Sequence, residues 1–135
     1  MLSKYKTRDV AKSLYTNCLK RAEECLDTAR IAFKNKDWNA ATICAVHSCI
    51  AACDSMCVFF LGKRHAGENH NDAVTLFKTI KRRDEKLNMN ANRLSRVLRV
   101  KNIAEYEERL VYESEAEKAL IDSERFLDYV KKVLT

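Results

Sequence analysis

The segment that decides the fold runs from Trp38 to Leu61 and reads WNAATICAVHSCIAACDSMCVFFL. It is far more apolar than a surface helix. Its few polar side chains do not form one continuous solvent-exposed face. They are Thr42, His47, Ser48, Asp54 and Ser55. A helix that is apolar on nearly all sides has to be enclosed by other elements, and at about 1.5 Å per residue this one is roughly 36 Å long. We therefore predict that it is the central helix of a helical bundle.

A membrane span is the alternative interpretation of this segment, since about 20 apolar residues cross a bilayer. His47 and Asp54 lie near its middle, where a charged side chain is costly in a membrane. The N-terminal sequence MLSKYKTRDV also lacks the apolar core of a signal peptide. We therefore expect no membrane span and a cytoplasmic protein.

The whole composition favours helices. The length of 135 residues predicts a single domain, 1–135. Proline is absent, Gly occurs only at positions 62 and 67, and no segment alternates as a strand does. The expected fold class is all-α, an up-and-down antiparallel four-helix bundle with one extra short helix.

Six cysteines need an explanation, and four of them lie in the central segment. Helix geometry forbids most disulfides between these four. Cys49, Cys53 and Cys57 repeat every four residues, and three thiols in one straight line cannot all reach one ion, as a closed zinc site requires. We expect free thiols that fill the core of a protein from a reducing compartment, with no metal site and no cofactor.

Helix signals divide the N-terminal half into three segments. Thr7 or Asp9 is the expected cap of a first helix that ends near Lys34. Asp37 is the expected cap of the central helix, and Gly62 is a natural stop for it. Residues 63–70 are expected to form a polar loop.

The C-terminal half should hold one short helix and two long ones. The short helix begins at His70 or Asn71, and a charged connection follows at 81–89. A long helix begins at Asn90 or Asn92 and extends to about residue 110. Ser114 and Glu117 match the S-x-x-E capping box of a last helix.

Charge is unevenly distributed along the C-terminal half. The stretch from Lys78 to Lys101 holds nine basic residues and two acidic ones, and the stretch from Glu105 to Asp128 holds nine acidic residues and three basic ones. This pattern suits an anionic partner or self-association. The alternative is that both stretches are solvated helix faces.

His47 and Asp54 are polar groups within the apolar central helix. They are seven residues apart and therefore about 10.5 Å apart along the axis, so they cannot bond to each other directly. Each needs a partner elsewhere, because a buried polar group without one is costly. They are either core polar groups paired with neighbouring helices or members of a ligand site.

The fourth long segment offers another polar set. Leu94, Leu98, Asn102 and Tyr106 share one stripe, so that Asn102 interrupts an apolar face. Arg99, with Arg96 one turn earlier, can present a guanidinium beside Asn102 and Tyr106 to an anion. The alternative is a polar contact inside the bundle.

Three motifs carry a resemblance to a known family. They are A-x-x-x-A-V-H-S-x-I-A-x-x-D-S from Ala41 to Ser55, H-N-D-A-V from His70 to Val74, and L-R-V-K-N-I-A-E-Y from Leu98 to Tyr106. In this order and spacing the chain resembles the HEPN domain family. The resemblance implies a helical bundle, a symmetric homodimer with the fourth helices near the interface, and often a nucleotidyltransferase-like partner protein.

Many HEPN proteins are metal-independent ribonucleases or toxins of toxin–antitoxin pairs, and their mark is Arg, four to six residues, then His, at the fourth helix. Here no His follows Arg96 or Arg99. Arg64 and His70 match the spacing, but in the expected loop. Imidazole is the usual acid or base for such cleavage.

Three functional hypotheses follow. The first is a non-catalytic HEPN-like dimeric module that binds a nucleotide, RNA or a nucleotidyltransferase-like partner protein. Its expected ligand-binding residues are His47, Asp54, Arg96, Arg99, Asn102 and Tyr106. The second is a divergent HEPN ribonuclease that uses Arg99 with Tyr106, or with His47 or His70. The third is a structural or regulatory subunit.

Overall fold

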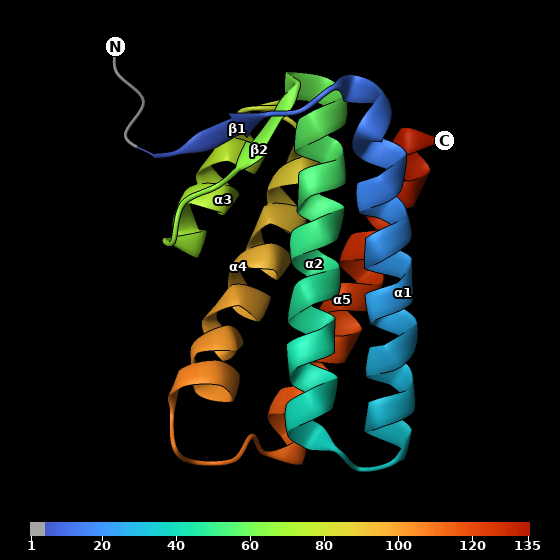
Figure 1. The fold of residues 1–135 in the computed structure, drawn as a ribbon, viewed down its shortest axis with the longest axis vertical. Coiled ribbons are helices and arrows are strands. Elements are labelled where there is room, and N and C mark those ends of the chain that lie inside the picture. Colours follow the sequence, from blue (N-terminus) through green and yellow to red (C-terminus); the bar gives the residue numbers. More distant parts are fainter. Residues whose placement is uncertain (1–4) are drawn as a thin grey trace.

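Helix α2 (Trp38–Leu61) runs through the centre of a helical bundle in the computed structural model, which describes residues 5–135 (Figure 1). Helices α1 (Tyr15–Lys34), α4 (Glu85–Tyr106) and α5 (Glu113–Leu134) all pack against it. Successive long helices run in opposite directions, as Figure 1 shows. The predicted all-α, up-and-down four-helix bundle is confirmed.

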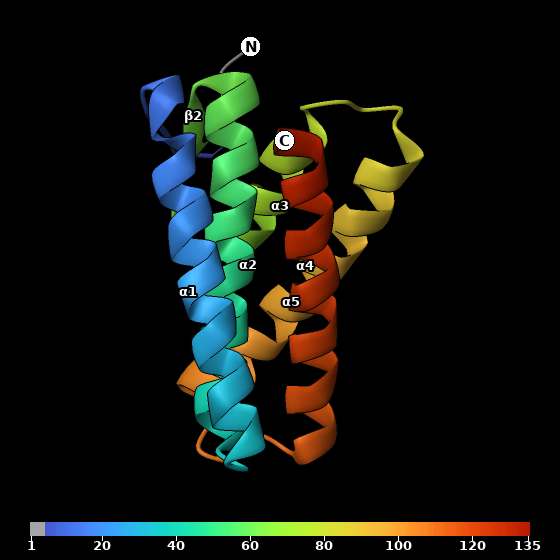
Figure 2. The same ribbon diagram turned by 90° about the vertical axis from the view of Figure 1, so that its right-hand side faces the viewer.

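Figure 2 shows how the four long helices are arranged around the core. Helices α1 and α5 stand side by side on one face, and α4 crosses behind α5 at an angle. The extra short helix is α3 (His70–Lys78), which packs mainly on α4. This arrangement leaves α2 in contact with every other helix.

Small side chains let α1 and α2 approach closely. Ala22 of α1 and Ala45 of α2 are fully buried. The Ser48 hydroxyl donates to the Ala22 carbonyl at 2.8 Å, and the Ser123 hydroxyl of α5 donates to the Ala45 carbonyl at 2.9 Å. Buried hydroxyls therefore satisfy their hydrogen-bonding groups on the backbone of neighbouring helices, as buried polar groups must.

Helix α2 is long and apolar enough to cross a membrane by length and composition, and it is the one such helix in residues 5–135. In this fold, 61% of its most apolar window is buried inside the protein. Burial in a bundle accounts for its apolar character, as predicted. The N-terminal segment in which no signal peptide is expected begins with residues 1–4, which lie outside the described residues.

All six cysteines are free thiols. Cys49, Cys53 and Cys57 are buried and fill space in the core, as expected, whereas Cys18, Cys25 and Cys44 are partly exposed. Burial raises the pKa of Cys49 to about 12, so that this thiol stays protonated. Within residues 5–135, no group of three or more His, Cys, Asp or Glu side chains is arranged to hold a metal ion.

Gly62 ends α2 as predicted. Its φ of 69° is left-handed, and its N–H donates to the Val58 carbonyl at 3.0 Å. Glycine adopts this conformation without the steric cost of a Cβ atom. At the other end, the Asp37 carbonyl accepts from the Ala41 N–H, but the Asp37 side chain makes no capping bond.

The predicted cap of the first helix at Thr7 or Asp9 is wrong. Residues Thr7–Asp9 form strand β1, which pairs antiparallel with strand β2 (Lys63–His65) in the segment predicted to be a polar loop. A 3-10 turn at Lys12–Leu14 leads into α1. Such short strands have no periodicity of their own and form because the chain after Gly62 returns beside the N-terminal segment.

Helix α4 begins earlier and ends earlier than predicted. The Asp84 carboxylate accepts from the Leu87 N–H at 2.9 Å and caps a helix that starts within the expected charged connection. Leu87 and Asn90 are buried, and this tertiary packing holds the first turns. The helix stops at Tyr106 because the following residues turn toward α5.

The predicted capping box at Ser114 and Glu117 is also wrong. The Glu115 carboxylate accepts from the Tyr112 N–H at 2.9 Å and binds the Arg109 guanidinium through both oxygens, at 2.9 and 2.8 Å. The hydrogen bond from Arg109 is the main reason that the pKa of Glu115 falls to about 2. The last helix therefore starts two residues earlier than its S-x-x-E sequence suggests, with Tyr112 in place of Ser114 at the N-cap position.

Candidate functional site

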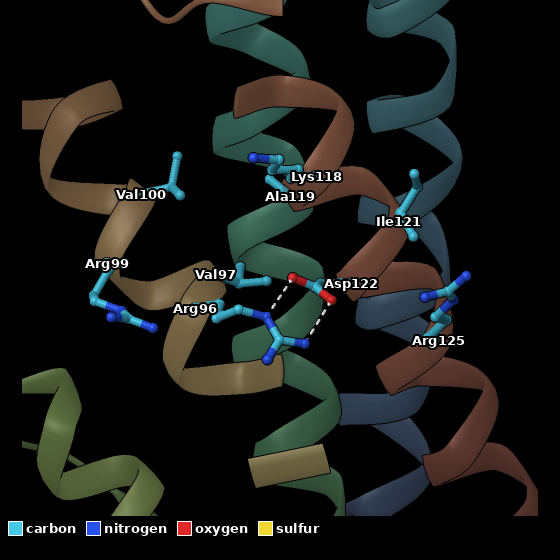
Figure 3. Close-up of a pocket in the computed structure, with 9 residues that line it drawn as sticks. All are labelled: Arg96, Val97, Arg99, Val100, Lys118, Ala119, Ile121, Asp122 and Arg125. Atoms are coloured by element: carbon cyan, nitrogen blue, oxygen red, sulfur yellow. Dashed lines mark hydrogen bonds and ion pairs between the residues drawn. The ribbon is translucent and has the colours of Figure 1, made fainter. Parts of the chain in front are cut away.

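A groove lies between α4 and α5 (Figure 3). Its volume is about 460 Å³. Apolar side chains from both helices line it: Val97, Val100, Ala119 and Ile121. Four basic side chains line it as well: Arg96, Arg99, Lys118 and Arg125. A partly apolar groove with cations at its edges can hold both the bases and the phosphates of a nucleic acid.

Arg96 is already paired within the protein. Its guanidinium donates two hydrogen bonds to the Asp122 carboxylate, at 3.1 and 3.0 Å, as Figure 3 shows. This bidentate ion pair joins α4 to α5 across the groove. Arg96, predicted to bind a ligand, therefore has a structural partner instead of a free charge.

The other three cations are available to a ligand. Arg99, Lys118 and Arg125 line the groove and make no hydrogen bond or ion pair with any residue in 5–135. Figure 3 shows Arg99 on the α4 side and Arg125 on the α5 side. Lys118 and Arg125 were not among the predicted site residues. They lie seven residues apart in an otherwise acidic stretch, and this spacing places them on one helix face.

The acidic run that follows α4 does not form a free counter-patch. Several of its carboxylates are paired with cations of the same chain: Glu105 with Lys101, Glu115 with Arg109, Asp122 with Arg96, Glu124 with Arg30, and Asp128 with Lys132. Each of these ion pairs removes one negative and one positive charge, so the net charge of +6 is unchanged by them.

The predicted face of Arg99, Asn102 and Tyr106 is solvent-exposed. Leu94 and Leu98 are buried, but Asn102 and Tyr106 on the same helix face are exposed. This face of α4 therefore packs in the core as far as Leu98 and faces solvent from Asn102 onward. Tyr106 is 69% exposed, and its hydroxyl accepts from the Lys101 ammonium at 3.3 Å. Arg99 lines the groove, whereas the hydroxyl of Tyr106 is hydrogen-bonded to Lys101.

A charged cluster lies near the C-terminal end of α4. The Lys101 ammonium is buried and lies 2.7 Å from one carboxylate oxygen of Glu105. The other carboxylate oxygen of Glu105 lies 3.6 Å from Nε2 of His47 on α2. Burial acts to lower the pKa of Lys101, but hydrogen bonds to Glu105 and Tyr106 outweigh it and raise that pKa. Lys101 and Glu105 were not predicted as site residues, although their i, i+4 spacing is typical of an ion pair.

His70 of α3 belongs to the same neighbourhood. Burial lowers its pKa below the ordinary value, and the charge of Lys101 lowers it further, while Glu105 opposes both. His47 also influences it electrostatically. His47 is half exposed, so it is not one of the two buried core groups that the sequence allowed.

Asp54 lies elsewhere on α2 and lines a smaller cavity with Arg64, His65 and His70. Burial raises its pKa to about 7, although Arg64 and Arg21 act in the opposite direction. No hydrogen bond satisfies its carboxyl group within residues 5–135. His47 and Asp54 are therefore parts of two different polar sites.

The sequence of the chain matches the family model of the HEPN domain over residues 15–133. The chain belongs to the HEPN family. No curated protein matches it. Membership supports a general HEPN function, which is often ribonuclease activity or a nucleotide-related role.

Helix α4 contains no histidine, so the arginine–histidine motif of HEPN ribonucleases is missing from it. The positions that follow Arg96 at the required distance are Lys101, Asn102 and Ile103, and those that follow Arg99 are Ala104, Glu105 and Tyr106. In space, however, His47 lies 3.6 Å from Glu105, and the charges of Lys101 and Glu105 influence the pKa of His70. Imidazoles from α2 and α3 thus lie close to the helix that lacks one.

Proposed function

We propose that this HEPN domain binds single-stranded RNA or the phosphates of a nucleotide in the groove between α4 and α5. The observation that carries the proposal is the set of three unpaired cations, Arg99, Lys118 and Arg125, around an apolar floor. Their guanidinium and ammonium groups bind phosphates, and Val97, Val100 and Ile121 offer apolar surface to bases.

The charge balance of the surface supports this choice of ligand. Arg82 and Arg83, in the turn before α4, and Lys86 in its first turn are exposed and have no ion pair among the described residues. Together with Arg99 of the groove they add unpaired positive charges in and before α4. An extended anion such as RNA can use several of these charges at once, and each phosphate contact makes the affinity more dependent on salt.

The test is fluorescence anisotropy with a labelled single-stranded RNA in EDTA, at several salt concentrations. Each cation removed from the groove should reduce the slope of log affinity against log salt by about 0.7, so Arg99→Gln with Lys118→Gln should reduce it by about 1.4. Lys20→Gln on α1, which removes a 72%-exposed lysine far from the groove, is the matched control. Equal affinity in the groove variant and the control would exclude the groove.

A second function, RNA cleavage, is favoured by one specific observation. His47 lies 3.6 Å from Glu105 near the end of α4, and Lys101, Glu105 and His47 all influence the pKa of His70, so that an acid and a base can act together on this side of α4. General acid–base transfer to and from the ribose and leaving oxygens needs no metal. In this hypothesis Arg99 or Lys101 stabilises the negative charge on the phosphate.

Cleavage is tested by incubating RNA with the protein in EDTA and separating the products on a gel. Wild-type cleavage that disappears in His47→Ala and in His70→Ala, with RNA affinity unchanged, would establish the ribonuclease. Intact RNA under conditions of saturating binding would leave the binding function alone. Cleavage that persists in the double variant would assign the activity to other residues or to a contaminant.

A further inference from the structure

A second, smaller cavity lies away from the groove, between α2, the segment that joins β2 to α3, and α4. Its volume is about 170 Å³. Its polar lining is Asp54, Arg64, His65 and His70, and its apolar lining includes Ile50 and Leu98. Helix α4 offers Leu94 and Leu98 to this cavity but Val97 and Val100 to the groove, so the two sites use different faces of α4.

His65 brings an unsatisfied polar atom to this cavity. The residue is only 8% exposed, and its Nε2 atom is buried without a hydrogen-bond partner in residues 5–135. A buried nitrogen without a partner costs free energy, so such a group calls for an explanation. A bound molecule that reaches Nε2 would supply the missing hydrogen bond.

Gly67 keeps the space beside this nitrogen open. A Cβ atom at position 67 would lie 3.2 Å from Nε2 of His65, closer than most Cβ contacts. Any larger residue would therefore fill the place of a hydrogen-bonding partner. The absence of a side chain at Gly67 and the unpaired nitrogen of His65 thus indicate the same place for a ligand.

Asp54 is the second polar group of interest in this cavity, and it makes no hydrogen bond within residues 5–135. Its carboxyl lines the cavity, and burial is the main reason that its pKa rises to about 7. Near neutral pH about half of the molecules therefore carry a protonated Asp54. In that form the carboxyl donates a hydrogen bond, and it adds no negative charge to the cavity.

The charges that face these groups come from every neighbouring element. Asp54 is influenced by Arg64 of β2 and Arg21 of α1. His65 is influenced by Asp72 of α3 and by Arg64, and burial lowers its pKa. His70 is influenced by His65, His47, Lys101 and Glu105.

We propose that this cavity binds a small organic acid, with its carboxylate between Arg64, His65 and Asp54 and its apolar part against Ile50 and Leu98. Arg64 supplies the positive charge that the carboxylate needs, and His65 supplies a hydrogen bond. The apolar lining favours a short aliphatic or aromatic acid over an inorganic anion. The volume is well below the roughly 300 Å³ at which drug-sized ligands begin to fit, so a nucleotide is too large.

Binding of the acid should depend on pH. An anion beside Asp54 binds well only when that carboxyl is protonated, since two carboxylates side by side repel each other. With a pKa of about 7 for Asp54, the affinity should fall about tenfold between pH 6 and pH 8. Asp54→Asn keeps the shape and the hydrogen-bond donor, so this variant should bind the acid with little dependence on pH.

The experiment titrates the full chain with benzoate and with butyrate and follows the imidazole signals of His65 and His70 by NMR. Benzamide replaces the carboxylate by an uncharged group, and inorganic phosphate replaces the organic acid by an inorganic anion. Arg64→Gln and Gly67→Ala should each weaken binding of the organic acid at least tenfold. Lys118→Gln removes one positive charge from the α4–α5 groove and should leave this binding unchanged, so loss of RNA binding and loss of acid binding are distinguishable.

Three results would overturn the proposal. Absence of any shift of the histidine signals at saturating millimolar benzoate and butyrate would show that the cavity takes no organic acid. Benzamide that binds as tightly as benzoate would show that no anion is recognised. Phosphate that binds more tightly than either acid would assign the cavity to an inorganic anion. Circular dichroism of each variant separates these outcomes from a loss of the fold.

Discussion

His47 and Glu105 meet across two helices that are far apart in the sequence: Nε2 of His47 on α2 lies 3.6 Å from Oε1 of Glu105 on α4. The other oxygen of Glu105 lies 2.7 Å from the buried ammonium of Lys101. This carboxylate therefore connects an imidazole from the central helix to the α4 segment in which the family's histidine is missing. The contribution of the Lys101–Glu105 ion pair to stability can be tested directly.

Replacement of Lys101 by Met should destabilise the fold. The side chain of Lys101 is 7% exposed and that of Glu105 is 21% exposed, so the change leaves a partly buried carboxylate without its main partner. We expect the free energy of unfolding to fall by about 1–3 kcal/mol, measured by urea denaturation. Lys101→Met with Glu105→Gln removes both charges and should recover most of this loss; a double variant as unstable as the single one would contradict the pairing.

Replacement of Asp54 by Asn should change how stability depends on pH. The pKa of Asp54 is about 7 in the folded protein and has an ordinary value of 3.8, so the folded state holds a proton that the unfolded chain releases between pH 4 and pH 7. The stability due to this proton is fully present below the lower value and is lost as pH rises through the higher one. Its total is of the order of 4 kcal/mol.

The measurement is urea denaturation of the wild type and Asp54→Asn across this pH interval. The wild type should lose stability relative to the variant as pH rises from about 4 to 7, and the difference should be constant above pH 8. Parallel curves for the two proteins would show that the folded and unfolded states bind the proton of Asp54 equally. The neighbouring variant Ser55→Ala, which keeps all charges, controls for packing.

Replacement of Asn102 by Leu should strengthen self-association. The resemblance to HEPN proteins implies a homodimer with the fourth helix near its interface, and Asn102 is exposed on α4. An apolar side chain at such an interface adds about 1–2 kcal/mol to association, because burial removes it from water. Analytical ultracentrifugation measures the dimer constant. Equal constants for the variant and the wild type would place the interface away from Asn102, and Asn17→Leu on α1 is the control for a general gain in apolar surface.

Replacement of Gly62 by Ala should cost about 1 kcal/mol of stability through the backbone alone. Its φ of 69° disfavours a Cβ atom, but a Cβ atom there would touch nothing within 4 Å. Thermal denaturation measures the loss. Gly62→Asn should lose less, because Asn tolerates the left-handed region better than Ala. An Ala variant as stable as the wild type would show that the chain relaxes out of this conformation.

The sequence and the structure differ most where contacts are made between distant segments. Helix periodicity places Asn102 and Tyr106 on the stripe of Leu94 and Leu98, but the stripe leaves the core because α4 ends beside the loop to α5. The boundaries of α4 were missed for the same reason: Leu87 and Asn90 become buried only when α4 packs on its neighbours. Local sequence signals carry no information on such packing.

What the sequence determined by itself is local. The composition of Trp38–Leu61 required a buried central helix, Gly62 required a helix end, and the residues after Arg99 exclude the family's histidine from α4. These features depend only on the order of the side chains along one helix. The tertiary structure alone decided the pairing of β1 with β2, the groove between α4 and α5, and the meeting of His47 with Glu105. It also brought His65, with its unpaired nitrogen, and Asp54 to the lining of one cavity, because the distance between such groups is set by helix packing and chain reversal, which no single segment encodes.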